Sequence, residues 1–188
     1  MSEDDPYVWP STDVLRNKLG IYDAAALDLA ERRLVLDQIA AGTPYGRFDL
    51  RHLQAIHRHL FQDVYDWAGE LRTVEISKGG NQFPFRRFID TGMADVHRRL
   101  EASDFLRDLP DDAFARQAAE IIGDVNYVHP FREGNGRTQL LYLDQLADRA
   151  DHPLNLRRLT RERWIPARQA AHQGRYGELA RLLLDALV

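Results

Sequence analysis

Apolar residues recur at helical spacing along most of this chain. The two clearest runs stand on either side of residues 129–137: Phe114, Ala118, Ile121, Ile122 and Val125 before them, and Leu140, Leu141, Leu143 and Leu146 after them. Intervals of three and four residues place such side chains on one face of a helix. The pattern therefore predicts two buried helices, one reaching Asn126 and one over residues 135–150, joined by a polar loop.

The same spacing predicts helices elsewhere, and residues that cap helices indicate where they begin. Asp23 and Asp49 can each cap a helix, the first of which reaches about Ala41. Either Asp111 or Asp112 can cap the helix before the polar loop. Further helices are expected over residues 13–20, over a stretch marked by Phe88, Met93, Val96 and Leu100, and over 160–173 and 176–188.

Residues 71–85 break the helical pattern. Residues 71–77 alternate apolar and polar side chains, which predicts a short strand. Lys78, Gly79, Gly80 and Asn81 suit a turn, and residues 82–85 can form the returning arm of a hairpin. An isolated hairpin is only marginally stable. It is therefore either a connector or an edge that can pair with an extended peptide, and the expected fold class is all-α with one short β-hairpin.

Length and composition indicate a globular protein. The chain has 188 residues, of which 44% are hydrophobic and 29% charged, and this size is typical of one domain. Residues 1–12 are polar and contain proline. We expect them to be a flexible lead-in, followed by a single domain over residues 13–188.

Charge and cysteine content exclude several classes of protein. The net charge of −4 and pI near 6.0 favour binding neither to nucleic acid nor to an anionic membrane. Without cysteine, the chain has no disulfide and no thiolate metal site. It has neither an apolar run of roughly 18 residues, as a membrane helix needs, nor the start of a cleaved signal. We expect a cytoplasmic protein, although export without a cleaved signal is compatible with these features.

The polar loop has the residues of a phosphate site. Gly134 and Gly136 allow a ligand to approach the backbone closely. They stand where the second helix begins, and the first N–H groups of a helix attract anions. Arg137 in the first turn is unfavourable for the helix dipole, so we expect its guanidinium to hold a phosphate. Asn135 can bond a phosphate oxygen or fix the loop.

Two further loop residues could act on a bound phosphate. Glu133 suits Mg²⁺, which typically takes one or two carboxylates together with substrate phosphates. His129 can exchange protons near neutral pH. Together these residues indicate phosphoryl or nucleotidyl transfer; the alternative is a solvated glycine-rich turn. Three other histidines lack the spacing of a metal-binding pair, and we expect them in the core or at the surface: His52, His57 and His59.

The sequence of residues 129–137, His-Pro-Phe-Arg-Glu-Gly-Asn-Gly-Arg, resembles the signature loop of the Fic family. That signature is His-x-Phe-x-(Asp/Glu)-Gly-Asn-Gly-Arg, followed after two residues by a second Arg. The resemblance implies a Fic-like helical bundle and a protein adenylyltransferase. Such an enzyme transfers AMP from ATP to a Ser, Thr or Tyr hydroxyl of a target protein and releases pyrophosphate.

The resemblance also implies roles for individual residues. His129 is then the catalytic base and Glu133 the Mg²⁺ ligand, while Phe131 points into the core. The nucleotide is then bound by Gly134, Asn135, Gly136 and Arg137.

The expected hairpin occupies the chain position of the family's β-hairpin flap. In the family this flap covers the nucleotide and docks the target peptide. Here it would run over residues 72–83, from Arg72 to Phe83. By resemblance, Lys78 and Gly79 of this flap lie beside the nucleotide.

Leu140 departs from the family pattern, because the second Arg is expected there. The family uses that Arg, one helical turn after Arg137, for the terminal phosphates. No arginine stands nearby in the sequence to replace it, since Arg149 is more than two turns further on. The alternatives to AMP transfer are a Fic-fold enzyme that uses another phosphate-bearing donor and a binding module with weakened catalysis. Gly136 opposes a kinase-like member, which has Lys at that position.

Many Fic proteins carry an inhibitory helix with the motif Ser/Thr-x-x-x-Glu-Gly/Asn. Residues 1–188 contain no such motif. The resemblance therefore places this chain either with members that a separate small antitoxin protein inhibits, or with unregulated members.

Overall fold

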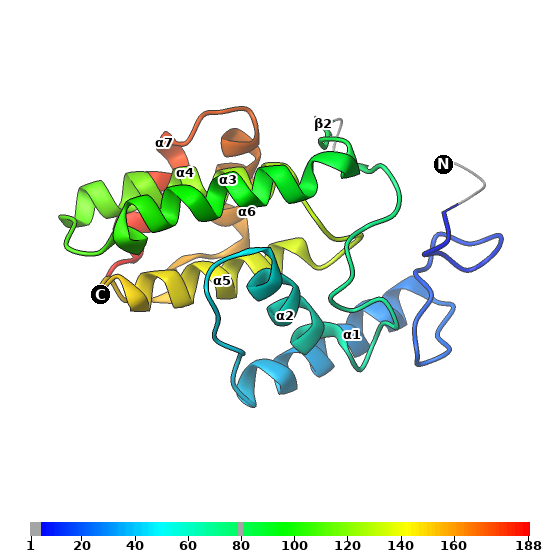
Figure 1. Cartoon of the computed structure of the whole chain (residues 1–188). Helices are drawn as coiled ribbons and strands as arrows, with labels where there is room; N and C mark the ends of the chain where they lie inside the picture. The colour runs from blue at the N-terminus through cyan, green and yellow to red at the C-terminus, as the bar shows by residue number, and fades with distance from the viewer. Residues whose placement is uncertain (1–4, 79–80) are drawn as a thin grey trace.

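The computed structural model describes residues 5–78 and 81–188, without the side chains of Lys78 and Asn81. This part of the chain is helical, as the sequence predicts (Figure 1). Its α-helices are α1 (Ala24–Ala40), α2 (Leu50–Phe61), α3 (Ile89–Ala102), α4 (Asp111–Val128), α5 (Asn135–Arg149), α6 (Arg161–His172) and α7 (Gly177–Ala186). Short 3-10 turns cover Arg86–Phe88, Asp104–Leu106 and Leu156–Arg158. None of the helices in the described residues is both long and apolar enough to cross a membrane.

Helices α4 and α5 form the centre of the molecule. Helix α4 packs against α3, α6 and α7, whereas α5 packs against α4 and α2, and α1 packs against α2 (Figure 1). The apolar faces predicted for both central helices are buried except at Leu140, which is partly buried. The following side chains have no exposed surface: Phe114, Ile122, Leu143 and Leu146. The polar loop between α4 and α5 is therefore anchored on both sides by buried helices.

Two of the expected helix caps are present, and one is wrong. Asp23 and Asp49 each accept a hydrogen bond from a backbone N–H of the following first turn, at 2.7 and 2.8 Å. Helix α4, however, begins after Pro110, which offers no side-chain cap. Asp111 and Asp112 lie inside its first turn, where a carboxylate interacts favourably with the helix dipole.

The helix predicted over residues 13–20 does not form. Leu15 instead pairs with Val8 in a single antiparallel bridge, and the N–H of Arg16 donates to the carbonyl of Tyr7 at 2.8 Å. Asn17 Nδ2 donates to two backbone carbonyls, at 2.9 and 2.7 Å. Because an isolated helical turn fixes several residues for few hydrogen bonds, these partners outside the helix prevail.

Residues 5–12 make specific contacts with the rest of the molecule. Tyr7 is buried and meets Trp67 edge to face, with ring centroids 5.3 Å apart. Asp5 forms an ion pair with Arg132 of the polar loop at 2.8 Å. The first described residues thus support the loop, while the division of the chain into a lead-in and one domain stays a prediction.

The segment over residues 71–85 is less regular than the predicted hairpin. Its strands, β1 (Ser77–Lys78) and β2 (Asn81–Gln82), have two residues each and pair antiparallel. The strand expected over 71–77 is therefore confined to its end. The buried side chain of Arg72 occupies the carbonyls of residues 74 and 84, which a partner strand would otherwise use. Gly79 and Gly80, the middle of the predicted turn, lie outside the described residues.

Candidate active site

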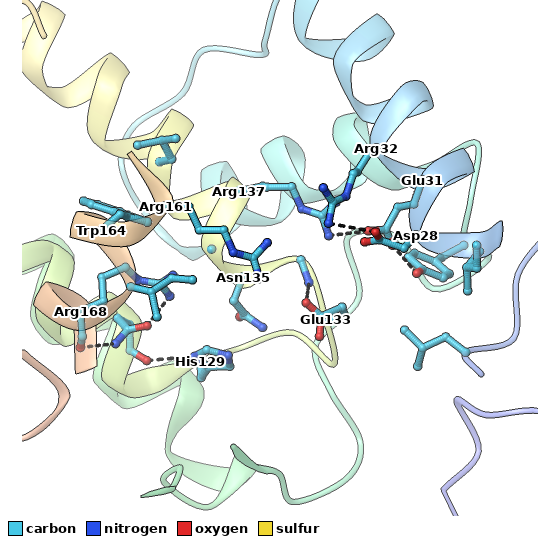
Figure 2. A pocket seen from close by; sticks show the side chains of 18 of the residues that line it. Asp28, Glu31, Arg32, His129, Glu133, Asn135, Arg137, Arg161, Trp164 and Arg168 are labelled. Carbon is cyan, nitrogen blue, oxygen red and sulfur yellow. Dashed lines mark hydrogen bonds and ion pairs between the residues drawn. The ribbon is translucent and has the colours of Figure 1, made fainter. Parts of the chain in front are cut away.

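A pocket opens where α4 ends and α5 begins (Figure 2). The loop residues that the sequence singles out all line it: His129, Glu133, Gly134, Asn135, Gly136 and Arg137. Its other walls come from residues 24–32 of α1 and 161–172 of α6, far from the loop in sequence. The structure therefore brings the predicted loop residues together and adds two helices that the sequence did not connect with them.

His129 ends α4 in the left-handed conformation, with φ 48° and ψ 64°, which is uncommon for a residue other than glycine. Its Nδ1 lies 3.0 Å from the carbonyl oxygen of Asn126. Since a carbonyl only accepts, Nδ1 carries the proton, and the neutral ring has its lone pair on Nε2. Phe83 stacks on this ring, with centroids 3.8 Å apart. The Asn126 carbonyl and the ring of Phe83 thus fix the orientation of the His129 ring.

Arg72 holds the backbone on which His129 stands. Its side chain is fully buried, and its Nε donates to the carbonyl of His129 at 2.9 Å. Its backbone N–H donates to the carbonyl of Pro130, also at 2.9 Å. Through the carbonyls of residues 74 and 84, the guanidinium ties the loop to both arms of the segment over 71–85. Nothing in the sequence indicated this role, because a single arginine in a short predicted strand is expected to face solvent.

Asn135 closes the loop on itself. Its Oδ1 accepts from the N–H of Phe131 at 3.0 Å, and its Nδ2 donates to the carbonyl of Phe131 at 2.8 Å. Of the two roles open to the Asn135 side chain, the structure shows that it fixes the loop. Phe131 points into the core as expected and is completely buried, stacked on His57 with centroids 3.9 Å apart.

His57 of α2 contacts the loop through its ring and through a hydrogen bond. Its Nδ1 accepts from the N–H of Gly69 at 2.8 Å, so Nε2 carries the proton and donates to the carbonyl of Glu133 at 3.0 Å. Burial lowers the pKa of His57 to about 4, so the ring is neutral at pH 7. The side chain of Glu133 accepts from the N–H of Gly134 at 3.1 Å and lines the pocket. His52 and His57 are both buried, as expected of core histidines.

Helix α5 begins at the pocket with unpaired backbone donors. Gly134 precedes it with φ 81° and ψ −4°, and a Cβ at this position would lie 2.5 Å from the ring of Phe61. Both the backbone conformation and the space therefore require glycine. No side chain caps α5, and within the described part of the chain no acceptor meets the N–H groups of residues 135–137. Such a helix end attracts anions, so this part of the pocket suits a phosphate.

Arg137 is held by an acid that the sequence reading missed. Its Nη2 lies 2.6 Å from Glu31 Oε1 of α1, and its guanidinium stands over the ring of Phe61 at 4.7 Å. Glu31 also accepts from the hydroxyl of Tyr65. A signal was present, because Glu31 stands four residues from both Leu27 and Val35 and shares their buried face of α1. A charged residue on the apolar stripe of a helix indicates a buried partner.

Two arginines of α6 line the same pocket as Leu140. Arg161 and Arg168 line it together with Leu140, and Figure 2 shows Arg161 extending toward the start of α5. No arginine replaces the missing one nearby in the sequence, but these two arginines, further along the chain, share the pocket of Leu140. Helix packing, which the local sequence does not encode, brings α6 to this position.

The residues predicted in the flap lie partly outside the described chain. Gly79 is not among the described residues, and Lys78 is described only by its backbone, which pairs with Asn81. Phe83, just after β2, is buried between His129 and His172, with ring centroids 3.8 and 5.0 Å from theirs. The segment after β2 thus borders the pocket beside the candidate base.

Comparison with known proteins shows relatives along nearly the whole chain. The profile of the Fic/DOC family matches residues 47–147, which include the loop. The "Probable protein adenylyltransferase y4lH" of Sinorhizobium fredii is 38% identical over 94% of this chain and 93% of its own length. The "Probable protein adenylyltransferase Fic" of Salmonella typhimurium is 36% identical over 95% of this chain and 88% of its own.

The fold of this chain is similar to that of solved Fic-domain structures. The structure of BepC protein from Bartonella tribocorum, a VirB-translocated effector solved with bound AMPPNP, superposes with a TM-score of 0.89. It covers 100% of this chain and 99% of its own at 24% identity, a level at which the likeness concerns the fold alone. Since the family profile spans more than half of the sequence and contains the pocket loop, the chain belongs to the Fic/DOC family.

Proposed function

We propose that this protein transfers AMP from ATP to a Ser, Thr or Tyr hydroxyl of a target protein. It is an enzyme of the nucleotidyltransferase class, like the relatives that are named protein adenylyltransferases. The bound AMPPNP of the BepC protein supports ATP as the donor. The observation that carries the proposal is the position of His129: its Nδ1 proton is fixed on Asn126, and it shares one pocket with the uncapped start of α5.

His129 acts as the base. A hydroxyl is a weak nucleophile, and Nε2 takes its proton as the oxygen attacks the α-phosphorus of ATP. The bond from that phosphorus to the bridging oxygen breaks, and pyrophosphate leaves. The carbonyl of Asn126 accepts from Nδ1–H and stabilises the imidazolium that forms.

The start of α5 stabilises the charge on the transferring phosphate. The N–H groups of Asn135, Gly136 and Arg137 point out of the helix end that Gly134 shapes, and preorganised donors of this kind are a major source of rate enhancement. The guanidinium of Arg137 adds a positive charge, which Glu31 holds in place. The Asn135 side chain contributes indirectly, because it fixes the loop.

The pocket fits a Mg²⁺ ion bound together with the phosphates. Among the described residues, no group of three or more His, Asp or Glu could hold a metal by itself. Glu133 nevertheless lines the pocket beside the start of α5, and one carboxylate with phosphate oxygens is a typical Mg²⁺ site. Glu133 would hold the ion, which would neutralise phosphate charge during transfer.

The segment over residues 72–83 would act as the flap. Phe83 packs on His129, so a peptide that pairs with this segment would bring its hydroxyl close to the base. Lys78 and Gly79 would then lie beside the nucleotide. By its resemblance to the Fic family, we further propose that the enzyme acts in the cytoplasm and is either the toxin partner of a small antitoxin protein or unregulated.

Transfer of label from ATP tests the function. The protein is incubated with Mg²⁺, a cell lysate and ATP labelled at the α- or the γ-phosphate. We expect a protein band labelled only from the α-phosphate, and His129→Ala should lower its rate by about 10²- to 10⁴-fold. The matched control is His97→Ala, whose ring pairs with Glu101 on α3 outside the pocket. Label from the γ-phosphate alone would instead indicate a phosphotransferase, and no label a binding module.

A further inference from the structure

The cations that line the pocket differ in their partners. Arg32 forms an ion pair with Asp28 at 2.9 Å, and Arg137 forms one with Glu31 at 2.6 Å. Arg161 and Arg168, both from α6, have no such close ion pair among the described residues, although the charge of Glu133 favours the charged form of Arg168. Among the described residues, the positive charge that is least paired within this pocket therefore lies on α6.

Arg168 is half-buried, whereas Arg161 is exposed. Its Nη2 donates to Asn126 Oδ1, whereas its buried Nε meets no acceptor among the described residues. Burial lowers the pKa of Arg168 to about 10, so the side chain is still charged at neutral pH. A partly buried guanidinium whose Nε lacks an acceptor is costly, and an anion in the pocket would offset that cost.

The guanidinium of Arg168 stands directly against the start of α5. A Cβ at Gly136 would lie 2.8 Å from Arg168 Nη1. Any residue other than glycine at position 136 would therefore push the guanidinium away. An anion at this place would meet both Arg168 and the unpaired N–H groups of α5, two independent features that favour the same ligand.

We propose that Arg168, with Arg161 at the rim of the pocket, binds the polyphosphate chain of the donor and replaces the cation that is missing at Leu140. The proposal rests on the proposed function for the identity of the anion, a nucleoside triphosphate. Residue 140 lies one helical turn after Gly136, so it faces the same region of the pocket. The positive charge near the phosphates is then carried by arginines of α6 and not by an arginine at position 140 of α5.

Titration calorimetry of the purified chain tests this assignment with three probes: ATP, inorganic tripolyphosphate and adenosine. Arg168→Met should weaken the binding of ATP and tripolyphosphate by about tenfold to a hundredfold, the usual loss for a hydrogen bond between charged groups. Binding of adenosine, which has no phosphate, should change by less than about twofold. Arg161→Met should also weaken the binding of ATP and tripolyphosphate but not of adenosine, with a smaller loss because Arg161 is exposed.

Matched variants separate charge from folding. Arg163→Met removes an arginine of the same helix that pairs with Asp185 outside the pocket, and it should leave all three affinities unchanged. Leu140→Arg added to Arg168→Met should restore much of the ATP affinity, which a misfolded protein would not show. Thermal unfolding of each variant is measured alongside.

The outcomes distinguish this assignment from the proposed function. Affinities of folded Arg168→Met within about twofold of the wild type for ATP and tripolyphosphate would overturn the role of Arg168, even if AMP transfer occurs. A wild-type protein that binds neither phosphate probe would overturn it too. Binding that depends on Arg168 without any AMP transfer would uphold the anion site and refute the transferase.

Discussion

The two sides of the pocket are built differently. The loop over residues 129–137 is held by uncharged contacts, such as the two hydrogen bonds between Asn135 and the backbone of Phe131 and the hydrogen bond from His57 to the carbonyl of Glu133. The opposite side consists of α1 and α6, whose charged side chains meet the loop from far away in sequence: Glu31 on Arg137 and Arg168 against Gly136. The loop therefore fixes the position of the reacting groups, and the helices opposite it set their electrostatic environment.

The largest effect on stability is expected when the loop loses its anchor. Phe131 is completely buried and stacked on His57, so Phe131→Ala should lower the free energy of unfolding by about 3–5 kcal/mol. Urea unfolding measures this value. The control Phe85→Ala truncates a phenylalanine that is 52% exposed and should cost less than about 0.5 kcal/mol. Equal losses in both variants would show that the loop does not depend on this anchor.

Acidification tests the loop in a second way. The pKa of His57 is about 4 in the folded protein against 6.5 ordinarily, so between these values the unfolded state binds the proton more tightly. The free energy of unfolding should fall as pH decreases from 7 to 4, with up to about 3 kcal/mol from this residue. His57→Gln removes the titrating ring and should reduce that fall, as urea unfolding at several pH values would measure. An unchanged pH dependence would contradict a neutral, buried His57.

The helix side of the pocket is tested by two acids of α1. Glu31 is buried against Arg137 and Tyr65, and Glu31→Gln should lower the free energy of unfolding by about 1–3 kcal/mol. Asp28, on the same helix, forms an exposed pair with Arg32, and Asp28→Asn should cost less than about 0.5 kcal/mol. Thermal or urea unfolding compares the two. Similar losses would mean that the burial of Glu31 contributes nothing.

The smallest effect is expected at Leu140. Because α6 already brings Arg161 and Arg168 to this region, Leu140→Arg should raise the affinity for ATP by less than about tenfold. Calorimetric titration measures the change in the otherwise unaltered protein. A gain of about a hundredfold would indicate that the pocket lacks a cation and that α6 does not replace it.

Sequence reasoning was most successful where neighbouring residues carry the information. The apolar spacing predicted α4 and α5, and Asp23 and Asp49 marked the starts of α1 and α2, because helices depend on contacts three or four residues apart. The expected helix over residues 13–20 failed, since its backbone pairs with residues 7 and 8 instead. The strand over 71–77 was also too long, because Arg72 occupies the carbonyls that a ladder needs.

The sequence by itself determined the loop, its flanking helices and its family, because nine consecutive residues carry a base, an acid, two glycines and an arginine. Only the tertiary structure decided which charged side chains surround these nine loop residues. The partners Glu31 and Arg168 come from helices whose position depends on how apolar faces pack, and packing brings together residues whatever their separation in sequence. The sequence motif therefore lacks an arginine at position 140, while the pocket still contains arginines supplied by α6.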